Sequence, residues 1–391
     1  MKISNRIRAL LICMSFLFIA LLINHFVDFH ITDHFEGIYL LKGDSKNRFL
    51  VTDHLFVGHE KKIILSKTFD SNYCNLSKKL SHCRKNPKNH LHVVWNRSDG
   101  SGYVSNQFSD GSGLVTYLGR FIDDDTNNEV HGLFVGGELP ETLENISRYK
   151  MNDSGMTYFD NKKWYHIWCS VNEGIGSPLT GVNIQPSKWE YIGSGIESQT
   201  SEKVVITSSH KVVIDGIPVK IDRKCTFTAG EPYFTLEILI TNIGTKLLFY
   251  NYLYGDEPWI GEYGNSLGDV GWVKDRIVNY EEMIDTSKYS FIGMADLGNR
   301  VIGEKPVYTN LANFIEWFGS EKPNYAYFTN KLEHFPTNAG TVPLDSNERF
   351  EGLQWDRFLA PKESATIRIA IGMAKFNPKT GIPEKPQTSW K

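Results

Sequence analysis

Residues 210–254 read HKVVIDGIPVKIDRKCTFTAGEPYFTLEILITNIGTKLLFYNYLY. Along each run, apolar residues alternate with polar ones, which is the pattern of half-buried β-strands. The Asp215-Gly216 pair between HKVVI and IPVKI suits a two-residue hairpin turn of type I′. Further turn residues follow at positions 229–232 and 242–244. The stretch therefore predicts a meander of consecutive antiparallel strands.

Similar short apolar runs, separated by Gly, Asn, Asp and Pro, recur through the rest of the chain. Helical patterns are few, and the best is LANFIEWF at residues 311–318, about two turns long. A chain of many short strands and turns predicts an all-β fold, an antiparallel sandwich or barrel. The clearest predicted strands outside the meander are residues 51–57, 62–66, 91–95, 164–172, 203–208 and 366–373.

The N-terminal stretch predicts the compartment. Residues 9–27 (ALLICMSFLFIALLINHFV) carry no formal charge and are long enough to span a bilayer as a helix. Basic residues precede this stretch and acidic residues follow it, which places the N-terminus in the cytoplasm and the rest of the chain outside it. We predict an uncleaved signal anchor, so that the protein crosses the lipid bilayer once. A cleaved signal peptide is the alternative, although no A-x-A-like cleavage site follows the stretch.

Composition then suggests four segments. Residues 1–30 form a cytoplasmic tip and the transmembrane anchor, and residues 31–90 form a stalk with accessory strands. The main β domain covers residues 91–376. The last segment, residues 377–391, is rich in Pro and Lys and is expected to be an exposed tail.

Four cysteines lie beyond the predicted anchor, and an even number outside the cytoplasm is consistent with disulfides. We expect Cys74 and Cys83 to form a local disulfide. Free thiols are one alternative, and a zinc site completed by His90 and His92 is another. The two cysteines in strand-like runs, Cys169 and Cys225, can be reduced core residues. No metal is predicted overall.

Charge and motifs exclude several classes of function. Lys and Arg number 42 against 45 Asp and Glu, for a net charge of -3, so the chain lacks the basic excess that nucleic-acid binding needs. The sequence contains no G-x-x-x-x-G-K-[ST], G-x-S-x-G, H-E-x-x-H or C-x-x-C motif. We therefore predict no nucleic-acid partner and no cofactor.

Two blocks of strands resemble those of the galactose mutarotase-like (aldose epimerase-like) superfamily. They are IDRKCTFTAGEPYFTLEILITNIGTKLLFY at residues 221–250 and LQWDRFLAPKESATIRIAIGMA at residues 353–374. Gly119-Arg120-Phe121 and Val130-His131-Gly132 are faintly similar to the G-R-F and His-Gly pairs of the epimerases. The resemblance implies that residues 91–376 form an antiparallel β-supersandwich that binds carbohydrate, with His131 as a substrate-binding residue.

The chain departs from the epimerases where their chemistry lies. Their N-H-x-Y motif is replaced by Asn251-Tyr252-Leu253-Tyr254, so Tyr252 stands where the catalytic His would be. Glu351 is the carboxylate nearest to the position of the family's catalytic Glu. The resemblance therefore implies the fold but not the mutarotase reaction.

Residues 250–272 mix carboxylates, aromatic rings and five glycines, which predicts a loop suited to sugars. Aromatic faces stack on sugar C–H groups, and carboxylates accept hydrogen bonds from hydroxyls. We predict Asp256 and Glu257 as catalytic acid and base. The alternative is an ordered surface loop whose aromatic residues pack inward. The predicted substrate-binding residues of this stretch are Tyr252, Tyr254, Trp259 and Glu262.

A second candidate stretch is WYHIWCSVNEG at residues 164–174. On a strand, Trp164, His166 and Trp168 share one face. We predict His166 as a catalytic acid or base, because imidazole titrates near neutral pH, with the two tryptophans as sugar-binding residues. A histidine hydrogen-bonded inside the sandwich is the alternative. Arg223 is a further predicted ligand contact.

Together these features predict a membrane-anchored, extracytoplasmic carbohydrate-binding protein that acts on an envelope or extracellular glycan by epimerisation or cleavage. The alternative is a non-catalytic envelope or assembly protein that uses the sandwich as a protein-interaction module. The sequence leaves open which sugar is bound and whether the protein is an enzyme.

Overall fold

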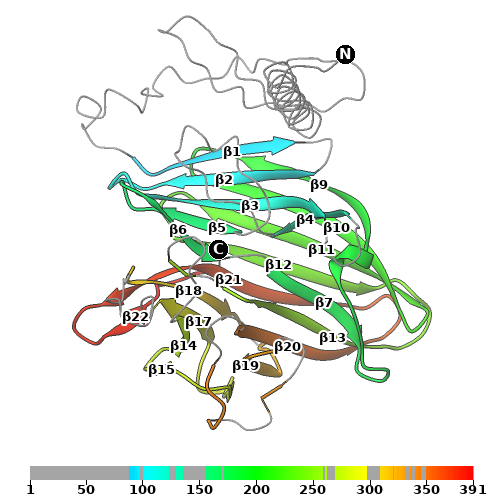
Figure 1. Ribbon diagram of the computed structural model, residues 1–391. Coiled ribbons are helices and arrows are strands. Elements are labelled where there is room, and N and C mark those ends of the chain that lie inside the picture. Colours follow the sequence, from blue (N-terminus) through cyan, green and yellow to red (C-terminus); the bar gives the residue numbers. More distant parts are fainter. Residues whose placement is uncertain are drawn as a thin grey trace, which may run out of the picture. The chain divides into compact units, whose positions relative to one another are not determined.

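The computed structural model describes most of the predicted β domain (Figure 1). The chain divides into two compact units, residues 1–65 and 66–391, and the described residues all belong to the second. Within them, no helix is long and apolar enough to cross a bilayer. The predicted anchor at residues 9–27, two predicted strands, Cys74, Cys83 and Cys169 lie outside the described residues. The described residues are 88–96, 100–122, 129–134, 155–168, 171–258, 260–261, 269–296, 309–319, 321–331, 335–336, 340–344 and 349–390.

This part of the chain is all-β, as predicted, with three antiparallel sheets and one short 3₁₀ turn, η2 (Pro186–Lys188). Sheet C, the largest, has the order β15-β14-β17-β18-β21-β12-β11-β10-β9, with β22 paired to β21. Its strands are β9 (Glu190–Gln199), β10 (Lys203–Ile214), β11 (Ile217–Thr228), β12 (Tyr233–Asn242), β14 (Asp269–Val273), β15 (Arg276–Val278), β17 (Phe291–Asp296), β18 (Leu311–Trp317), β21 (Ser364–Asn377) and β22 (Ile382–Glu384).

Two six-stranded sheets accompany it. Sheet A has the order β1-β2-β3-β5-β6, with β4 paired to β3, and sheet B has the order β16-β19-β20-β13-β7-β8. The strands of sheet A are β1 (His90–Asn96), β2 (Ser101–Gln107), β3 (Gly113–Ile122), β4 (Glu129–Phe134), β5 (Met156–Phe159) and β6 (Trp164–Trp168). Those of sheet B are β7 (Val171–Ser177), β8 (Val182–Ile184), β13 (Leu248–Asp256), β16 (Glu282–Ile284), β19 (Tyr325–Thr329) and β20 (Phe350–Leu359).

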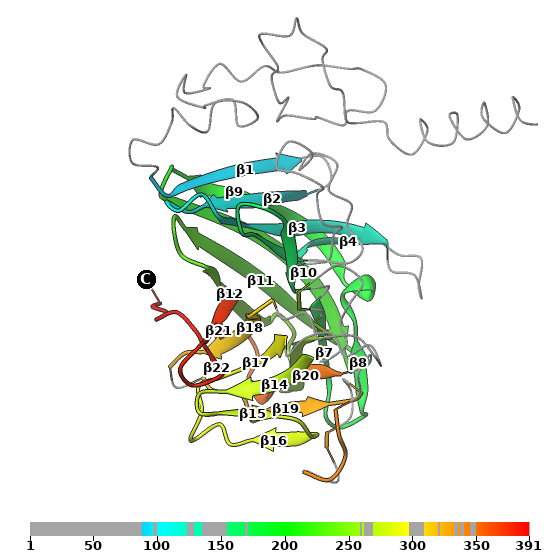
Figure 2. The same cartoon turned by 60° about the vertical axis from the view of Figure 1, so that its left-hand side comes forward.

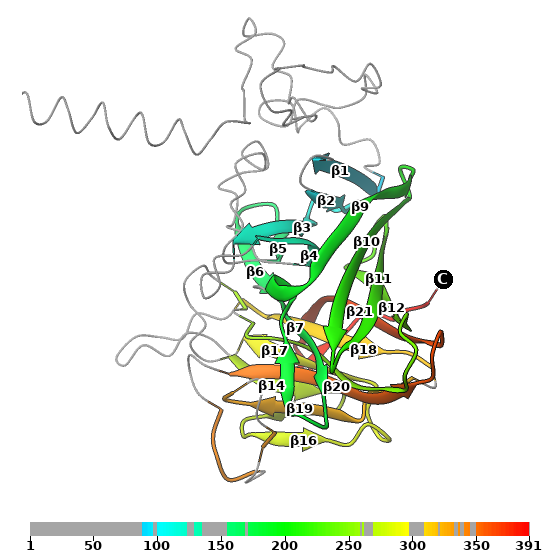
Figure 3. The ribbon, with the colours of Figure 1, turned by 90° about the vertical axis from the view of Figure 1, so that its right-hand side faces the viewer.

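Sheets A and B pack against the same face of sheet C (Figures 2 and 3). Strand β4 of sheet A contacts β9 and β10, while β17 of sheet C contacts β20 of sheet B. One apolar core fills the space between the layers and takes fully buried side chains from all three sheets, such as Trp168, Trp355 and Phe234. This burial is the main favourable contribution to folding.

The other face of sheet C carries a second, smaller core that includes Ala312, Phe314 and Ala370. The C-terminal segment packs near it: β22 pairs with β21, and the ring of Trp390 lies 5.9 Å from that of Phe318. Many of residues 377–390 are exposed, but β22 and Trp390 attach this part of the predicted tail to the sheet.

This second core explains why the predicted helix at residues 311–318 is wrong. The segment forms β18, in which all seven residues are buried. Leu311 and Ile315 face the main core, whereas Ala312 and Phe314 face the second. A strand covered on both faces loses the alternation of polar and apolar residues, so its sequence cannot be distinguished from a buried helix by periodicity.

The predicted hairpin is confirmed. Ile214 pairs with Ile217, and the positive φ angles of Asp215 (49°) and Gly216 (77°) are those that a type I′ turn requires. Strands β11 and β12 pair as predicted, but the meander ends there. Strand β13 crosses to sheet B and pairs with β7 and β20. The crossing buries the tyrosines of β13 between the layers.

The predicted strand at residues 164–172 is two strands, β6 in sheet A and β7 in sheet B. Strand β6 (WYHIW) is mostly apolar whereas β7 (VNEGIGS) is not, but no Gly, Pro, Asn or Asp separates the two in the sequence, so no turn residue marks the point where the chain changes sheets. The prediction that Cys225 is a reduced core residue is confirmed, because it is a free, buried thiol. Burial raises the pKa of Cys225 to about 12.

Candidate active site

Two carboxyl groups face the interior side by side at one end of sheet B. Asp256, the last residue of β13, is the register partner of Glu351 near the start of β20. Both side chains are fully buried. Directly opposed residues on one face of an antiparallel pair have Cβ atoms about 4.5–5.5 Å apart. The two carboxyl groups are thus close enough to act on one ligand.

The surroundings of Glu351 favour its protonated form. Asn313 of β18 donates a hydrogen bond of 2.8 Å from Nδ2 to Oε1 of Glu351. The amide of Asn313 is itself fixed, because its Oδ1 accepts a 2.6 Å hydrogen bond from the backbone N–H of Met294. Burial raises the pKa of Glu351 to about 8, and the hydrogen bond from Asn313 offsets only part of this effect. Glu351 therefore holds its proton at neutral pH.

An ion pair fixes the chain that follows Asp256. Arg349 donates hydrogen bonds from Nη2 to Asp269 (2.6 Å) and to the carbonyl oxygen of Pro258 (3.1 Å), and the N–H of Ile260 donates to the same Asp269 oxygen at 2.8 Å. Arg349 and Asp269 are both buried. Burial raises the pKa of Asp269, and the positive charge of Arg349 opposes this effect. The pair joins β14 and the start of β20 to the backbone of Pro258 and Ile260.

His166 is attached to the same segment through its backbone. Its N–H donates to the carbonyl oxygen of Gly261 (2.8 Å), and the N–H of Gly261 donates back at 3.0 Å. The side chain of His166 is fully buried. Gly261 has a φ of +108°, and a Cβ there would lie 2.8 Å from Oδ2 of Asp296. The structure thus brings β6 to the segment that follows Asp256, and only glycine fits at the contact.

The two predicted tryptophans pack inside the domain. Trp168 is fully buried and donates a long hydrogen bond (3.4 Å) from Nε1 to the carbonyl oxygen of Gly372. Trp164 is nearly buried, with its ring 5.1 Å from that of Phe159. In this conformation Trp168 has no exposed surface that could stack on a sugar.

Arg223 and Tyr252 belong to a separate buried cluster. Both donate hydrogen bonds to the carboxyl group of Glu173 on β7, Arg223 from Nη1 and Tyr252 from its hydroxyl. Burial raises the pKa of Glu173, an effect that Arg223 opposes. Burial also raises the pKa of Tyr254, so this phenol stays protonated. The cluster joins sheets B and C across the core.

For the remaining predicted residues the structure gives at most the strand or burial. Glu257 is half-buried and follows Asp256 at the end of β13, and His131 lies on β4. Trp259 and Glu262 are outside the described residues. Among the residues that the structure describes, no group of three or more His, Cys, Asp or Glu side chains is arranged to hold a metal ion.

Sequence reasoning assigned no role to four residues that build the site or its neighbouring cluster, although two of them, Glu173 and Asp269, lie in the candidate stretches. A weak signal existed for each, namely a polar residue inside an otherwise apolar strand or at the end of one. These residues are Glu173, Asp269, Asn313 and Arg349.

Comparisons with known proteins give structural matches only. No protein-family model matches the sequence, and neither does any curated protein. The chain is similar to the solved structure of a galactose mutarotase-like protein from Clostridium acetobutylicum, with 10% identity over 75% of this chain and 100% of that one and a TM-score of 0.34. A galactose mutarotase-like protein from Lactobacillus casei matches at 6% identity, covering 72% and 99%, with a TM-score of 0.33.

The α-galactosidase from Lactobacillus brevis matches at 10% identity and a TM-score of 0.32. The match covers 74% of this chain but only 40% of that enzyme. All of these likenesses concern the fold alone. Galactose mutarotase-like proteins, the group that two blocks of the sequence resemble, are thus among the structural matches, at low identity and low TM-score.

Proposed function

We propose that the protein is an extracytoplasmic carbohydrate-binding protein, anchored by residues 9–27, that transfers protons at a bound sugar with Asp256 and Glu351. A supersandwich covering residues 91–376 presents this site. The observation that carries the proposal is the pairing of Asp256 with Glu351 on one buried face, with the pKa of Glu351 raised to about 8.

Such a pair has the two properties that acid–base chemistry on sugars requires. Glu351 holds a proton that it can donate near neutral pH, and Asp256 is the adjacent group that can accept one. Opening a sugar ring takes a proton from the anomeric hydroxyl and gives one to the ring oxygen. Cleavage of a glycosidic bond likewise needs a proton donor and a second carboxylate. The same pair therefore fits epimerisation or glycan cleavage.

Access and orientation are the further requirements. Asp256 and Glu351 have no exposed surface, so a sugar reaches them only when the side chains that cover them move. His166 is a third proton-transferring group in the proposal, because its strand is attached to Gly261, five residues after Asp256. Arg349 and Asn313 act as positioning residues at the end of sheet B where Asp256 and Glu351 lie.

The test is proton NMR of the full chain, purified in detergent, with a panel of mono- and oligosaccharides. Faster anomeric exchange or new reducing ends would identify the reaction. We expect Asp256→Asn and Glu351→Gln each to slow it by about a hundredfold or more. Glu190→Gln, which changes an exposed carboxylate on β9, serves as the matched control. Unchanged rates in both site variants would contradict the proposal.

One observation favours the second candidate, a non-catalytic assembly protein. Phe249 and Phe358 are register partners on the outer face of sheet B, 41% and 65% exposed, with ring centroids 6.2 Å apart. An exposed apolar pair of this kind suits a protein contact. No response to any sugar, together with self-association in sedimentation that Phe358→Ser abolishes, would favour this candidate.

A further inference from the structure

A pocket of about 340 Å³ opens at the opposite end of strands β14, β17 and β18 from the buried carboxyl groups. Its lining includes Lys274, just after β14, Phe291 at the start of β17 and Trp317 at the end of β18. The volume is near the lower end of the range of small-molecule sites, about 300–1,000 Å³. The pocket is therefore of a size for one sugar residue.

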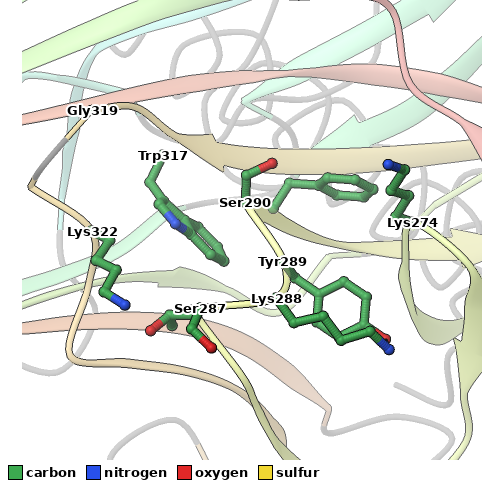
Figure 4. A pocket seen from close by; sticks show the side chains of 10 residues that line it. Lys274, Ser287, Lys288, Tyr289, Ser290, Trp317, Gly319 and Lys322 are labelled. Atoms are coloured by element: carbon green, nitrogen blue, oxygen red, sulfur yellow. The ribbon is translucent and has the colours of Figure 1, made fainter.

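Three lysines from three separate elements line this pocket: Lys274, Lys288 and Lys322 (Figure 4). Lys288 is committed to its neighbours, since its Nζ lies 3.4 Å from Asp275 and donates a hydrogen bond of 2.6 Å to the hydroxyl of Tyr289. Neither Lys274 nor Lys322 forms an ion pair within 4.0 Å with a carboxylate of the described residues. Two ammonium groups thus remain for a ligand.

The carboxylates of Asp275 and Asp285 lie outside the lining of the pocket, next to residues that belong to it. Asp285 accepts hydrogen bonds from the N–H (2.8 Å) and hydroxyl (2.6 Å) of Ser287, which lower the pKa of Asp285. Asp275 accepts a hydrogen bond of 2.9 Å from the hydroxyl of Tyr289. Counting these two negative charges against the three lysines leaves one positive charge, which suits a monoanion.

The rest of the lining suits a sugar rather than a bare anion. Ser287 and Ser290 supply hydroxyl oxygens, whose hydrogens are donated to Asp285 and Glu316. Phe291 and Trp317, 3% and 5% exposed, supply a small area of aromatic surface. In Figure 4, Trp317 and Ser290 lie between Lys322 on one side and Lys274 on the other. Aromatic rings contact the C–H groups of sugars, and hydroxyls exchange hydrogen bonds with those of a sugar. A phosphate ion would use the lysines but neither of these features.

We propose that this pocket binds an acidic sugar residue, a hexuronate that lies between Lys274 and Lys322, with its carboxylate next to one of these lysines and its ring next to the small exposed part of Trp317. The inference rests on the proposed function and extends it, because it identifies the glycan that the protein binds as an acidic one. It gives the chain a second contact with the glycan, at the end of the strands opposite to Asp256 and Glu351.

Saturation-transfer NMR and calorimetry on the full chain in detergent test this inference. The probes are methyl β-D-glucuronide, methyl β-D-glucoside and inorganic phosphate. We expect the glucuronide to bind more tightly than the glucoside. The double variant Lys274→Ala/Lys322→Ala should weaken glucuronide binding by about tenfold or more, and salt should weaken it further. Lys246→Ala, at an exposed lysine of the β12–β13 loop, is the matched control.

Each other outcome would overturn the inference. Equal binding of glucoside and glucuronide would show that the carboxylate contributes nothing to binding. Competition by phosphate at equal affinity would show that the pocket binds anions in general. Unchanged binding in the double variant would place the ligand elsewhere. The proposed reaction is judged separately, since Asp256→Asn should leave glucuronide binding at this pocket unchanged while it slows proton transfer.

Discussion

Strands β14, β17 and β18 end in two opposite chemical environments. At one end lie the buried carboxyl groups of Asp269 and Asp296, which are register partners, with Asn313 next to them on β18. At the other end Lys274 and Lys322 are next to an open pocket. A strand of five residues such as β14 spans only about 17 Å, so the two environments are close neighbours.

The comparison teaches that the same kind of charged residue acts differently when it is buried. At the buried end each charge is costly unless it has partners, so Arg349 and Asp269 hold each other and the backbone around them. Glu351 has no cation within 4.0 Å among the described residues, and burial raises its pKa to about 8, as it raises that of Asp269 against the opposing charge of Arg349. At the open end the lysines are exposed to water, which screens their interactions, so they can bind a ligand without supporting the fold.

The largest expected effect comes from breaking the buried ion pair. Arg349→Met leaves the charge of Asp269 buried without its cation, which should cost about 3–5 kcal/mol of unfolding free energy. Urea denaturation measures this cost. Arg368→Met, which breaks a half-exposed pair with Glu237, is the control and should cost about 1 kcal/mol or less. Similar losses of unfolding free energy in the two variants would show that the buried ion pair stabilises the fold no more than the half-exposed one does.

The next effect is the pH dependence that Glu351 contributes. Its pKa is about 8 in the folded chain and near 4.5 when unfolded, so between these values the unfolded state binds fewer protons. Stability should therefore fall as pH rises from about 5 to 8, by up to about 1.4 kcal/mol per pH unit from this group.

Glu351→Gln should remove that contribution, so the variant's stability curve should be flatter than that of the wild type across this window. Urea titrations at pH 5, 6, 7 and 8 would show the difference. Parallel curves for the two proteins would mean that Glu351 is already ionised in the folded state, and it could then not serve as the proton donor.

A pair of glycines sharpens the comparison of the two ends. Gly261 (φ +108°) and Gly319 (φ +74°) both have conformations that disfavour other residues, but a Cβ would clash with Asp296 only at Gly261. Alanine at Gly319 should cost about 1 kcal/mol from backbone strain. Gly261→Ala should cost about 1–3 kcal/mol more, measured by thermal unfolding. Equal costs in the two variants would mean that Asp296 can move to accommodate the added Cβ at position 261.

The smallest effect should come from the open end. Lys274→Ala and Lys322→Ala should each change the unfolding free energy by no more than about 0.5 kcal/mol, because neither lysine has a carboxylate partner within 4.0 Å among the described residues. Urea denaturation at low salt gives the most sensitive measurement. A loss above 1 kcal/mol would show that these lysines support the fold instead of being available to a ligand.

Local rules predicted the parts of the fold that depend on neighbours in sequence. The Asp215-Gly216 turn and the strands around it follow from alternation and turn geometry alone. Strand β18 was missed because both of its faces are covered by residues distant in the sequence. The crossing of β13 to sheet B was missed for the same reason, since its partners β7 and β20 come from far before and after it.

The candidate site was only half predictable. Asp256 was identified from its surroundings in the sequence, whereas Glu351 was noticed only as the nearest carboxylate in a family resemblance. Their pairing depends on the register of β13 with β20, which no local pattern reveals. Burial then decides the roles, because the pKa of Glu351 depends on how completely the layers exclude water.

The position of β21 has a consequence for biosynthesis. This strand lies between β18 and β12 in the middle of sheet C, yet of the described strands only β22 is made after it. A nascent chain that ends before Ser364 has both halves of the sheet but nothing to join them, so β12 and β18 each present an unpaired edge. The domain can therefore close only after Asn377 has been made, and a chain released before that point would expose two edges prone to aggregation.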